Sequence, residues 1–103
     1  MNEVNGIHQY VRDSKGHPVG VIAAVEHEGV VGIAGSMCNP KDRFDVKTGL
    51  TKSYGRAQGN ATKGRNRPLP YTLKKEKGLV EQFKVRAQKF FKDKEVLLEN
   101  LAD

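Results

Sequence analysis

The sequence has no tryptophan, a single cysteine and no long apolar run. Its large aromatic side chains are three tyrosines and four phenylalanines. We therefore expect a modest hydrophobic core in this chain of 103 residues. The single thiol, Cys38, excludes an internal disulfide and fits a reducing compartment. No stretch of about eighteen apolar residues is present, which excludes a membrane-spanning helix, and residues 1–5 lack the basic and apolar regions of a signal peptide. We therefore expect a single domain over residues 1–103, away from membranes, that gains stability by forming a homo-oligomer.

Motifs for metal binding and for catalysis are also missing. The three histidines are scattered and no HxxxH or CxxC pair occurs, so we expect no metal. Glycine-rich phosphate loops of the Walker or Rossmann form are absent, and we expect no cofactor. Cys38 and Ser36 are candidate nucleophiles, but there is no G-x-S-x-G elbow and no histidine follows Cys38. We expect a protein that is not an enzyme.

Basic residues are concentrated in the second half of the chain. The net charge is +6, yet residues 1–40 contain two basic and four acidic residues, whereas residues 41–94 contain sixteen basic and five acidic ones. This asymmetry predicts a surface for an anionic partner, with a solvated lysine-rich face as the alternative. Arginines among the lysines, as at Arg65 and Arg67, favour phosphate because the guanidinium fork matches its geometry.

The order of apolar runs and turn residues predicts an α+β fold, with a small antiparallel sheet of about three to five strands followed by two helices. Residues 7–36 are predicted to form a β-meander, with turns at residues 13–16 and 26–29. The second and third strands are apolar throughout, so we expect both of their faces to be covered. The remaining chain is predicted to form a polar turn and first helix over residues 37–57, a loop over 58–71 and a C-terminal helix over 72–101.

The segment over residues 35–57 carries the candidate ligand-binding residues. Asp45 can cap the helix that follows, and the first N–H groups of a helix favour an anion. Around this helix end the sequence provides an amide, an aromatic ring and four cations: Asn39, Phe44, Lys41, Arg43, Lys52 and Arg56. Such groups bind a small nucleotide. Each also has a structural alternative: Phe44 can anchor the turn, Asn39 can bond to its own backbone, and Arg56 can form a surface ion pair.

Nonspecific nucleic-acid binding is a second hypothesis. The basic residues over 63–94, together with Tyr54, Tyr71, Phe83 and Phe90, form a candidate footprint. No motif of a sequence-specific reader accompanies them, and aromatic residues at helical spacing are predicted to be buried. The small-nucleotide hypothesis is therefore the first choice.

Three segments resemble a known family. Residues 11–20 (V-R-D-S-K-G-x-P-V-G), 35–44 (G-S-M-C-N-P-K-D-R-F) and 54–57 (Y-G-R-A) are similar to small phage-encoded proteins of the Thoeris anti-defence sponge family. Proteins of that family sequester a cyclic ADP-ribose isomer that a host TIR-domain enzyme makes as an alarm signal. The resemblance spans roughly residues 10–57.

The resemblance implies an antiparallel sheet with helices, assembled as a dimer or higher oligomer, with ligand pockets near subunit boundaries. It implies a non-catalytic protein that sequesters a cyclic nucleotide or cyclic ADP-ribose immune signal in the cytoplasm of the infected bacterial host. The asparagine and the arginine of the family's pocket match Asn39 and Arg56. The family has a second basic residue one helical turn after that arginine, where this chain has Asn60, so Lys52 or the loop arginines would have to compensate. An aromatic residue that stacks on adenine is also implied, without an assigned position.

Overall fold

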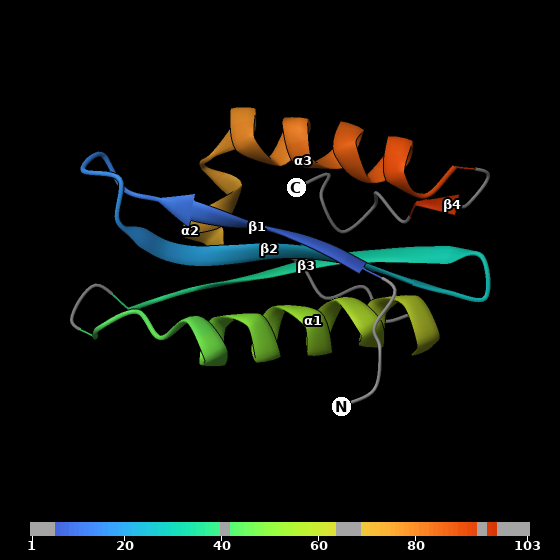
Figure 1. Ribbon diagram of the computed structural model, residues 1–103, viewed down its shortest axis with the longest axis horizontal. Coiled ribbons are helices and arrows are strands. Elements are labelled where there is room, and N and C mark those ends of the chain that lie inside the picture. Colours follow the sequence, from blue (N-terminus) through green and yellow to red (C-terminus); the bar gives the residue numbers. More distant parts are fainter. Residues whose placement is uncertain (1–5, 40–41, 64–68, 93–94, 97–103) are drawn as a thin grey trace.

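The described strands form one sheet, which lies between a long helix and two shorter helices (Figure 1). The protein is seen here in a computed structural model, which describes residues 6–39, 42–63, 69–92 and 95–96. The elements are β1 (Gly6–Arg12), β2 (Pro18–His27), β3 (Val30–Met37), α1 (Val46–Lys63), α2 (Tyr71–Lys74), α3 (Lys77–Phe90) and β4 (Glu95–Val96). The first three strands are antiparallel neighbours, and β4 pairs with β3 in parallel. The predicted α+β class is confirmed.

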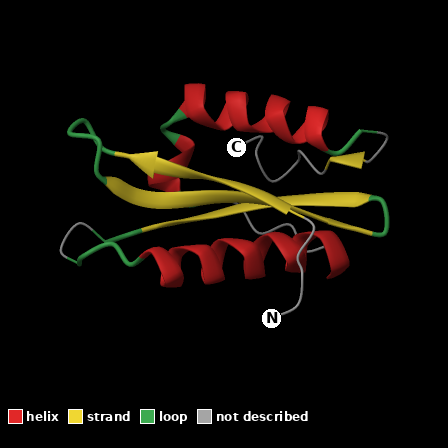
Figure 2. Ribbon diagram, viewed as in Figure 1, coloured by secondary structure: helices red, strands yellow, loops and turns green. Residues whose placement is uncertain are grey.

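The β-meander follows the predicted turns. Gly16 and Gly29 both have positive φ, at 85° and 84°, which glycine adopts without a Cβ penalty. The turn between β2 and β3 consists of Glu28, also at positive φ, and Gly29, as a type I′ hairpin requires. This turn pairs His27 with Val30 and so fixes the register of the two apolar strands. Helices cover both faces of these strands, as predicted (Figure 2).

Small residues separate α1 from the sheet. Ala23, Ala34 and Ala57 are buried in this layer, and Tyr54 packs against them. At Gly32, a Cβ would meet the carbonyl oxygen of Ala57 and would lie 2.6 Å from the backbone nitrogen of Ala61. The backbones of α1 and β3 can approach this closely only because the strand carries no side chain at that point.

The opposite face of the sheet carries the larger apolar cluster. It contains residues from β1, β2, β3, α2 and α3, together with Leu69 before α2 and Phe91 after α3: Ile7, Val11, Ile22, Ala24, Val31, Ile33, Leu69, Leu73, Val80, Phe83, Ala87 and Phe91. Phe83 is the largest of the fully buried side chains. Of the two neighbouring phenylalanines at the end of α3, Phe91 lies in this cluster at 4% exposure, whereas Phe90, which was expected to be buried within the helix packing, is 56% exposed in the single chain.

Two predicted boundaries are wrong. The first helix continues to Lys63, so the predicted loop over 58–71 is helical over residues 58–63. Burial of Asn60 and Ala61 against β3 stabilises this last part of the helix despite its polar composition.

The second boundary lies in the predicted helix over 72–101, which is divided into α2, α3 and the short strand β4, with residues 97–103 outside the described part. Glu76, at φ −85° and ψ 62°, leaves the helical conformation between α2 and α3. The break lets α2 contact β3 while α3 contacts β1 and β2.

Candidate functional site

The end of β3 and the first turns of α1 enclose a cleft of about 370 Å³, which we call the α1 cleft. It lies where the polar turn enters the helix. Its lining residues are Ser36, Met37, Cys38, Asn39, Asp42, Arg43, Phe44, Asp45, Thr48, Gly49 and Lys52.

The structure brings four of the six predicted ligand-binding residues to this cleft. They are Asn39, Arg43, Phe44 and Lys52. Lys41 lies outside the described residues. Arg56 does not line the α1 cleft, because its guanidinium turns to the sheet and Nη1 donates to the carbonyl oxygen of Gly35 at 3.0 Å.

Asp45 caps α1, as the sequence predicts. Its carboxylate accepts a hydrogen bond from the backbone N–H of Thr48 at 3.2 Å and another from the Thr48 hydroxyl. The Thr48 hydroxyl is the main reason that the pKa of Asp45 is lowered, and the Thr48 N–H adds to it. The Thr48 N–H is therefore already occupied by a carboxylate. An anionic ligand in the cleft has to depend on side-chain cations more than on this N–H group.

Charges of both signs line the α1 cleft. Arg43 and Lys52 supply two cations, and Asp42 and Asp45 supply two carboxylates. Cations pair with phosphate, whereas carboxylates accept hydrogen bonds from hydroxyl and amino groups. The cleft is thus suited to a ligand that carries both kinds of group.

Phe44 has two roles at the cleft. Its ring is half-buried and lies edge-on to Tyr10 at a centroid distance of 6.5 Å. A Cβ on Gly49 would lie 3.1 Å from the same ring, so the ring packs directly on the start of α1. Phe44 therefore anchors the turn, and it also presents a face to the cleft.

Two buried hydroxyl groups, Ser36 in the lining of the cleft and Ser53 behind it, join α1 to the sheet. Ser53 of α1 donates to the carbonyl oxygen of Val21 at 3.0 Å. Ser36 of β3 lies 2.9 Å from the Ser53 hydroxyl and 3.2 Å from the carbonyl oxygen of Gly49, so its single hydrogen serves one of these two acceptors. These bonds tie α1 to two strands and hold the walls of the cleft in place.

Arg56 belongs to a neighbouring cleft of about 760 Å³, which we call the Arg56 cleft. Met37, Cys38 and Asn39 line both clefts, so this segment forms the wall between them. The asparagine and the arginine that the resemblance singles out, Asn39 and Arg56, both line the Arg56 cleft, whereas Lys52 lines only the α1 cleft. The remaining lining residues of the Arg56 cleft are Asp13, Val19, Pro70 and Thr72.

Asn60 does not reach either cleft. It is 1% exposed, and its Nδ2 donates to the carbonyl oxygen of Ile33 at 3.0 Å. The position one turn after Arg56 thus faces β3 in this chain. A basic side chain there would be directed at the sheet and not at a ligand.

A polar pair that the sequence did not indicate joins β1 to α1. His8 Nδ1 lies 2.7 Å from the Tyr54 hydroxyl oxygen. Burial, and then the nearby Arg86, lower the pKa of His8, while burial raises the pKa of Tyr54. The two residues are 46 positions apart, so no local pattern could have paired them.

The described residues contain no cluster of three histidine, cysteine or acidic side chains suited to a metal ion. Within the same part of the chain, no helix is long and apolar enough to cross a membrane. No protein-family model matches the chain, and neither does any curated protein or solved structure. The assignment of a site therefore depends on the chemistry of the residues described above.

Proposed function

We propose that this protein binds a small phosphate-bearing nucleotide, of the cyclic nucleotide or cyclic ADP-ribose type, in the α1 cleft and releases it unchanged. The observation that carries the proposal is the convergence of an amide (Asn39), an aromatic ring (Phe44) and two cations (Arg43 and Lys52) on one cleft. Its volume of about 370 Å³ falls within the range of about 300–1,000 Å³ that small-molecule pockets occupy.

The mixed charges of the cleft support a nucleotide over a simple anion. Arg43 and Lys52 can pair with phosphate oxygens, and the carboxylates can accept hydrogen bonds from ribose hydroxyl or base amino groups. No histidine is among the lining residues, and the Cys38 sulfur lies 3.4 Å from the backbone carbonyl oxygens of both Asn39 and Asp42, so its single hydrogen serves one of these two acceptors. A nucleophile paired with a general base is therefore lacking among the lining residues, which favours binding without turnover.

The resemblance of residues 11–20, 35–44 and 54–57 to the Thoeris anti-defence sponges supports the biological part of the proposal. In that role a phage protein acts in the cytoplasm of the infected bacterium and sequesters the immune signal before it reaches its receptor. A homo-oligomer, dimer or higher, is part of the proposal, with the neighbouring subunit closing the open side of the cleft.

Calorimetric titration with cyclic ADP-ribose-type ligands tests the site. Lys52→Ala and Arg43→Ala each remove a charge-assisted phosphate contact, and we expect each to cost about 1.5–3 kcal/mol, or roughly ten- to a hundredfold in affinity. Lys47→Ala is the matched control, because Lys47 is an exposed α1 lysine that does not line the cleft. A loss confined to Arg56→Ala would overturn the α1 cleft as the site and assign the ligand to the Arg56 cleft.

Nonspecific nucleic-acid binding on the outer surface of α2 and α3 is the second candidate. Tyr71 and Phe90 are 73% and 56% exposed, beside the exposed Lys75, Lys89 and Lys92. Exposed rings and cations together are what single-stranded nucleic acid contacts. This candidate predicts that the logarithm of the binding constant for oligonucleotides falls linearly with the logarithm of the salt concentration. The absence of a mobility shift even at low salt would remove it.

A further inference from the structure

A second cationic groove runs between β1 and α3, with an open volume of about 520 Å³. It shares no lining residue with the α1 cleft or the Arg56 cleft. The lining residues are His8, Gln9, Tyr10, Arg12, Leu79 and Arg86. None of them is acidic, in contrast with the α1 cleft.

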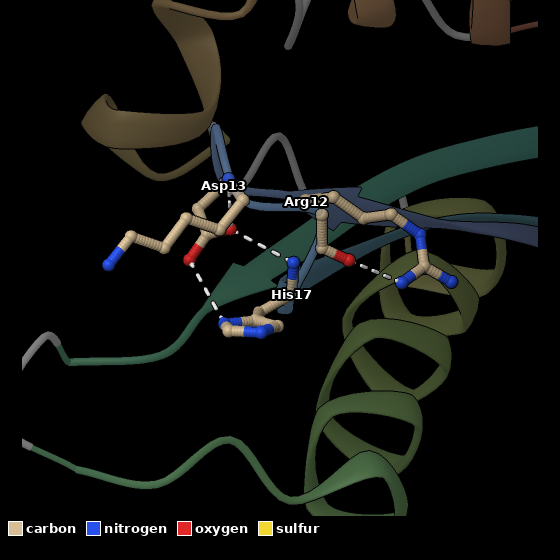
Figure 3. Close-up of polar contacts among 5 residues, drawn as sticks. Arg12, Asp13 and His17 are labelled. Carbon is tan, nitrogen blue, oxygen red and sulfur yellow. Dashed lines mark hydrogen bonds and ion pairs between the residues drawn. The ribbon is translucent and has the colours of Figure 1, made fainter.

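Arg12 is held at one end of this groove by the turn that follows β1. Its Nη1 donates to the carbonyl oxygen of Gly16 at 2.9 Å, and its guanidinium carbon lies 5.9 Å from the centre of the Tyr10 ring. Figure 3 shows the neighbouring Asp13 turned to His17 instead. Asp13 accepts the backbone N–H groups of Lys15 and His17 at 2.9 Å each, so the turn itself occupies this carboxylate.

Arg86 approaches the groove from α3. Its Nη1 lies 3.4 Å from the carbonyl oxygen of His8, to which it donates. After burial, Arg86 is the second cause of the lowered pKa of His8, which means that its positive charge acts on this part of β1. β1 is an edge strand of the described sheet, so its outer backbone groups face the groove.

A guanidinium that bonds to a neutral carbonyl keeps its full charge and its other N–H donors. Arg12 and Arg86 both line this groove, and none of its lining residues is acidic. Two positive charges on one groove, with no carboxylate among its lining residues, favour a bound anion there. We propose that Arg12 and Arg86 form a second anion site, independent of the α1 cleft, which takes the phosphate group of a nucleotide or of a nucleic-acid strand. Tyr10 supplies a ring face and Gln9 an amide beside that phosphate.

The test uses two probes that share one base: thymidine 5′-monophosphate and a short oligothymidylate. Each is titrated into the full chain, with the imidazole NMR signals of His8 and His27 as reporters. His8 lines the groove, whereas His27 lies at the hairpin between β2 and β3 and serves as the internal control. We expect the His8 signal to shift and the His27 signal to stay in place.

Charge-removing variants then assign the site. We expect Arg12→Gln and Arg86→Gln each to weaken probe binding about tenfold. Lys89→Gln, an exposed α3 lysine outside the groove, should change the affinity less than about twofold. Lys52→Gln in the α1 cleft should also leave the groove affinity unchanged, and this result separates the second site from the proposed function.

The two probes distinguish the sources of the phosphate. Arginine-dependent binding of the monophosphate supports a free nucleotide, and arginine-dependent binding of the oligothymidylate alone supports a nucleic-acid strand. The proposal is overturned if neither probe shifts His8, or if Lys89→Gln weakens binding as much as the arginine variants do. Arg12→Gln keeps the test decisive if Arg86→Gln does not fold, because Arg12 is exposed and donates its hydrogen bond to Gly16 of the turn.

Discussion

At the scale of single residues, Gly32 sets the distance between α1 and the sheet. In Gly32→Ala, the new methyl group would meet backbone atoms of Ala57 and Ala61, which cannot turn aside as a side chain can. We expect the variant to lose about 1–3 kcal/mol of unfolding free energy, measured by urea denaturation, because α1 must move off β3.

Gly55→Ala is the matched control for Gly32→Ala. Gly55 lies in α1 with no atom within 4 Å of the position of a Cβ. Alanine there should raise the unfolding free energy by about 0.5–1 kcal/mol, since it improves helix propensity without a clash. Equal effects of the two substitutions would contradict the close contact of α1 and β3.

Tertiary contacts determine the role of Asn60, a position at which the family resemblance implies a basic residue. Asn60→Lys would introduce the basic residue that the resemblance implies at this position, but it would place an ammonium group between α1 and β3, where Asn60 is 1% exposed. We expect a loss of several kcal/mol in unfolding free energy, or no folded protein. Gln58→Lys, an exposed change of the same charge on the same helix, should stay within about 0.5 kcal/mol. A stable Asn60→Lys protein with tighter ligand binding would place position 60 in the site.

At the scale of the elements, the start of α1 depends on the ionised form of Asp45. Hydrogen bonds from Thr48 lower its pKa below the usual value of 3.8, so the folded state binds the proton less readily than the unfolded chain does. The cap therefore contributes stability above that usual value, and the contribution is lost as pH falls through the lowered pKa of the folded state. The urea midpoint should decrease in that acidic range.

Asp45→Asn isolates this contribution, because asparagine also caps helices but does not titrate. We expect the acid-side decrease of the urea midpoint to become smaller in this variant. Asp42→Asn, the same change of charge outside the cap, should retain the wild-type decrease. The pKa of Asp13 is also lowered, chiefly by the His17 backbone N–H, so part of the acid dependence should persist. An unchanged pH profile in Asp45→Asn would show that the cap does not contribute.

The elements that could be predicted from the sequence are those with local signals. Glycines at 16 and 29 marked the turns, and Asp45 marked the start of α1. The end of α1 could not be predicted, because residues 58–63 are polar and become helical through burial of Asn60 and Ala61 against Gly32. Within the site, the cluster around residues 39–52 was predicted from one continuous segment. The position of Arg56 could not be predicted, since it depends on a hydrogen bond to the carbonyl oxygen of Gly35 in β3.

At the scale of the whole molecule, the described basic residues of the second half of the sequence lie on two sides of the sheet. The sheet separates α1, with Lys52 and Arg56, from α3, with Arg86 and Lys89 (Figure 1). The α1 cleft and the Arg12–Arg86 groove share no lining residue, but Tyr10 of the groove lies edge-on to Phe44 of the cleft, so the two sites are neighbours. Charge counting along the chain could predict an anionic partner, but it could not divide the charge between two faces.

Binding without turnover has a consequence for the stability of the whole protein. A ligand that binds only the folded state, at about a hundred times its dissociation constant, adds about 2.7 kcal/mol of stability. For a domain of this size we expect the midpoint of thermal unfolding to rise by roughly 10–20 °C. The Lys52→Ala variant should show a smaller rise at the same ligand concentration, while Lys47→Ala should match the wild type.

After the complex is unfolded by heat, mass spectrometry of the released ligand should recover its original mass, because no bond is broken in the cleft. Recovery of a hydrolysed product, formed only when the folded protein is present, would mean that the protein is an enzyme and that the proposed function is wrong.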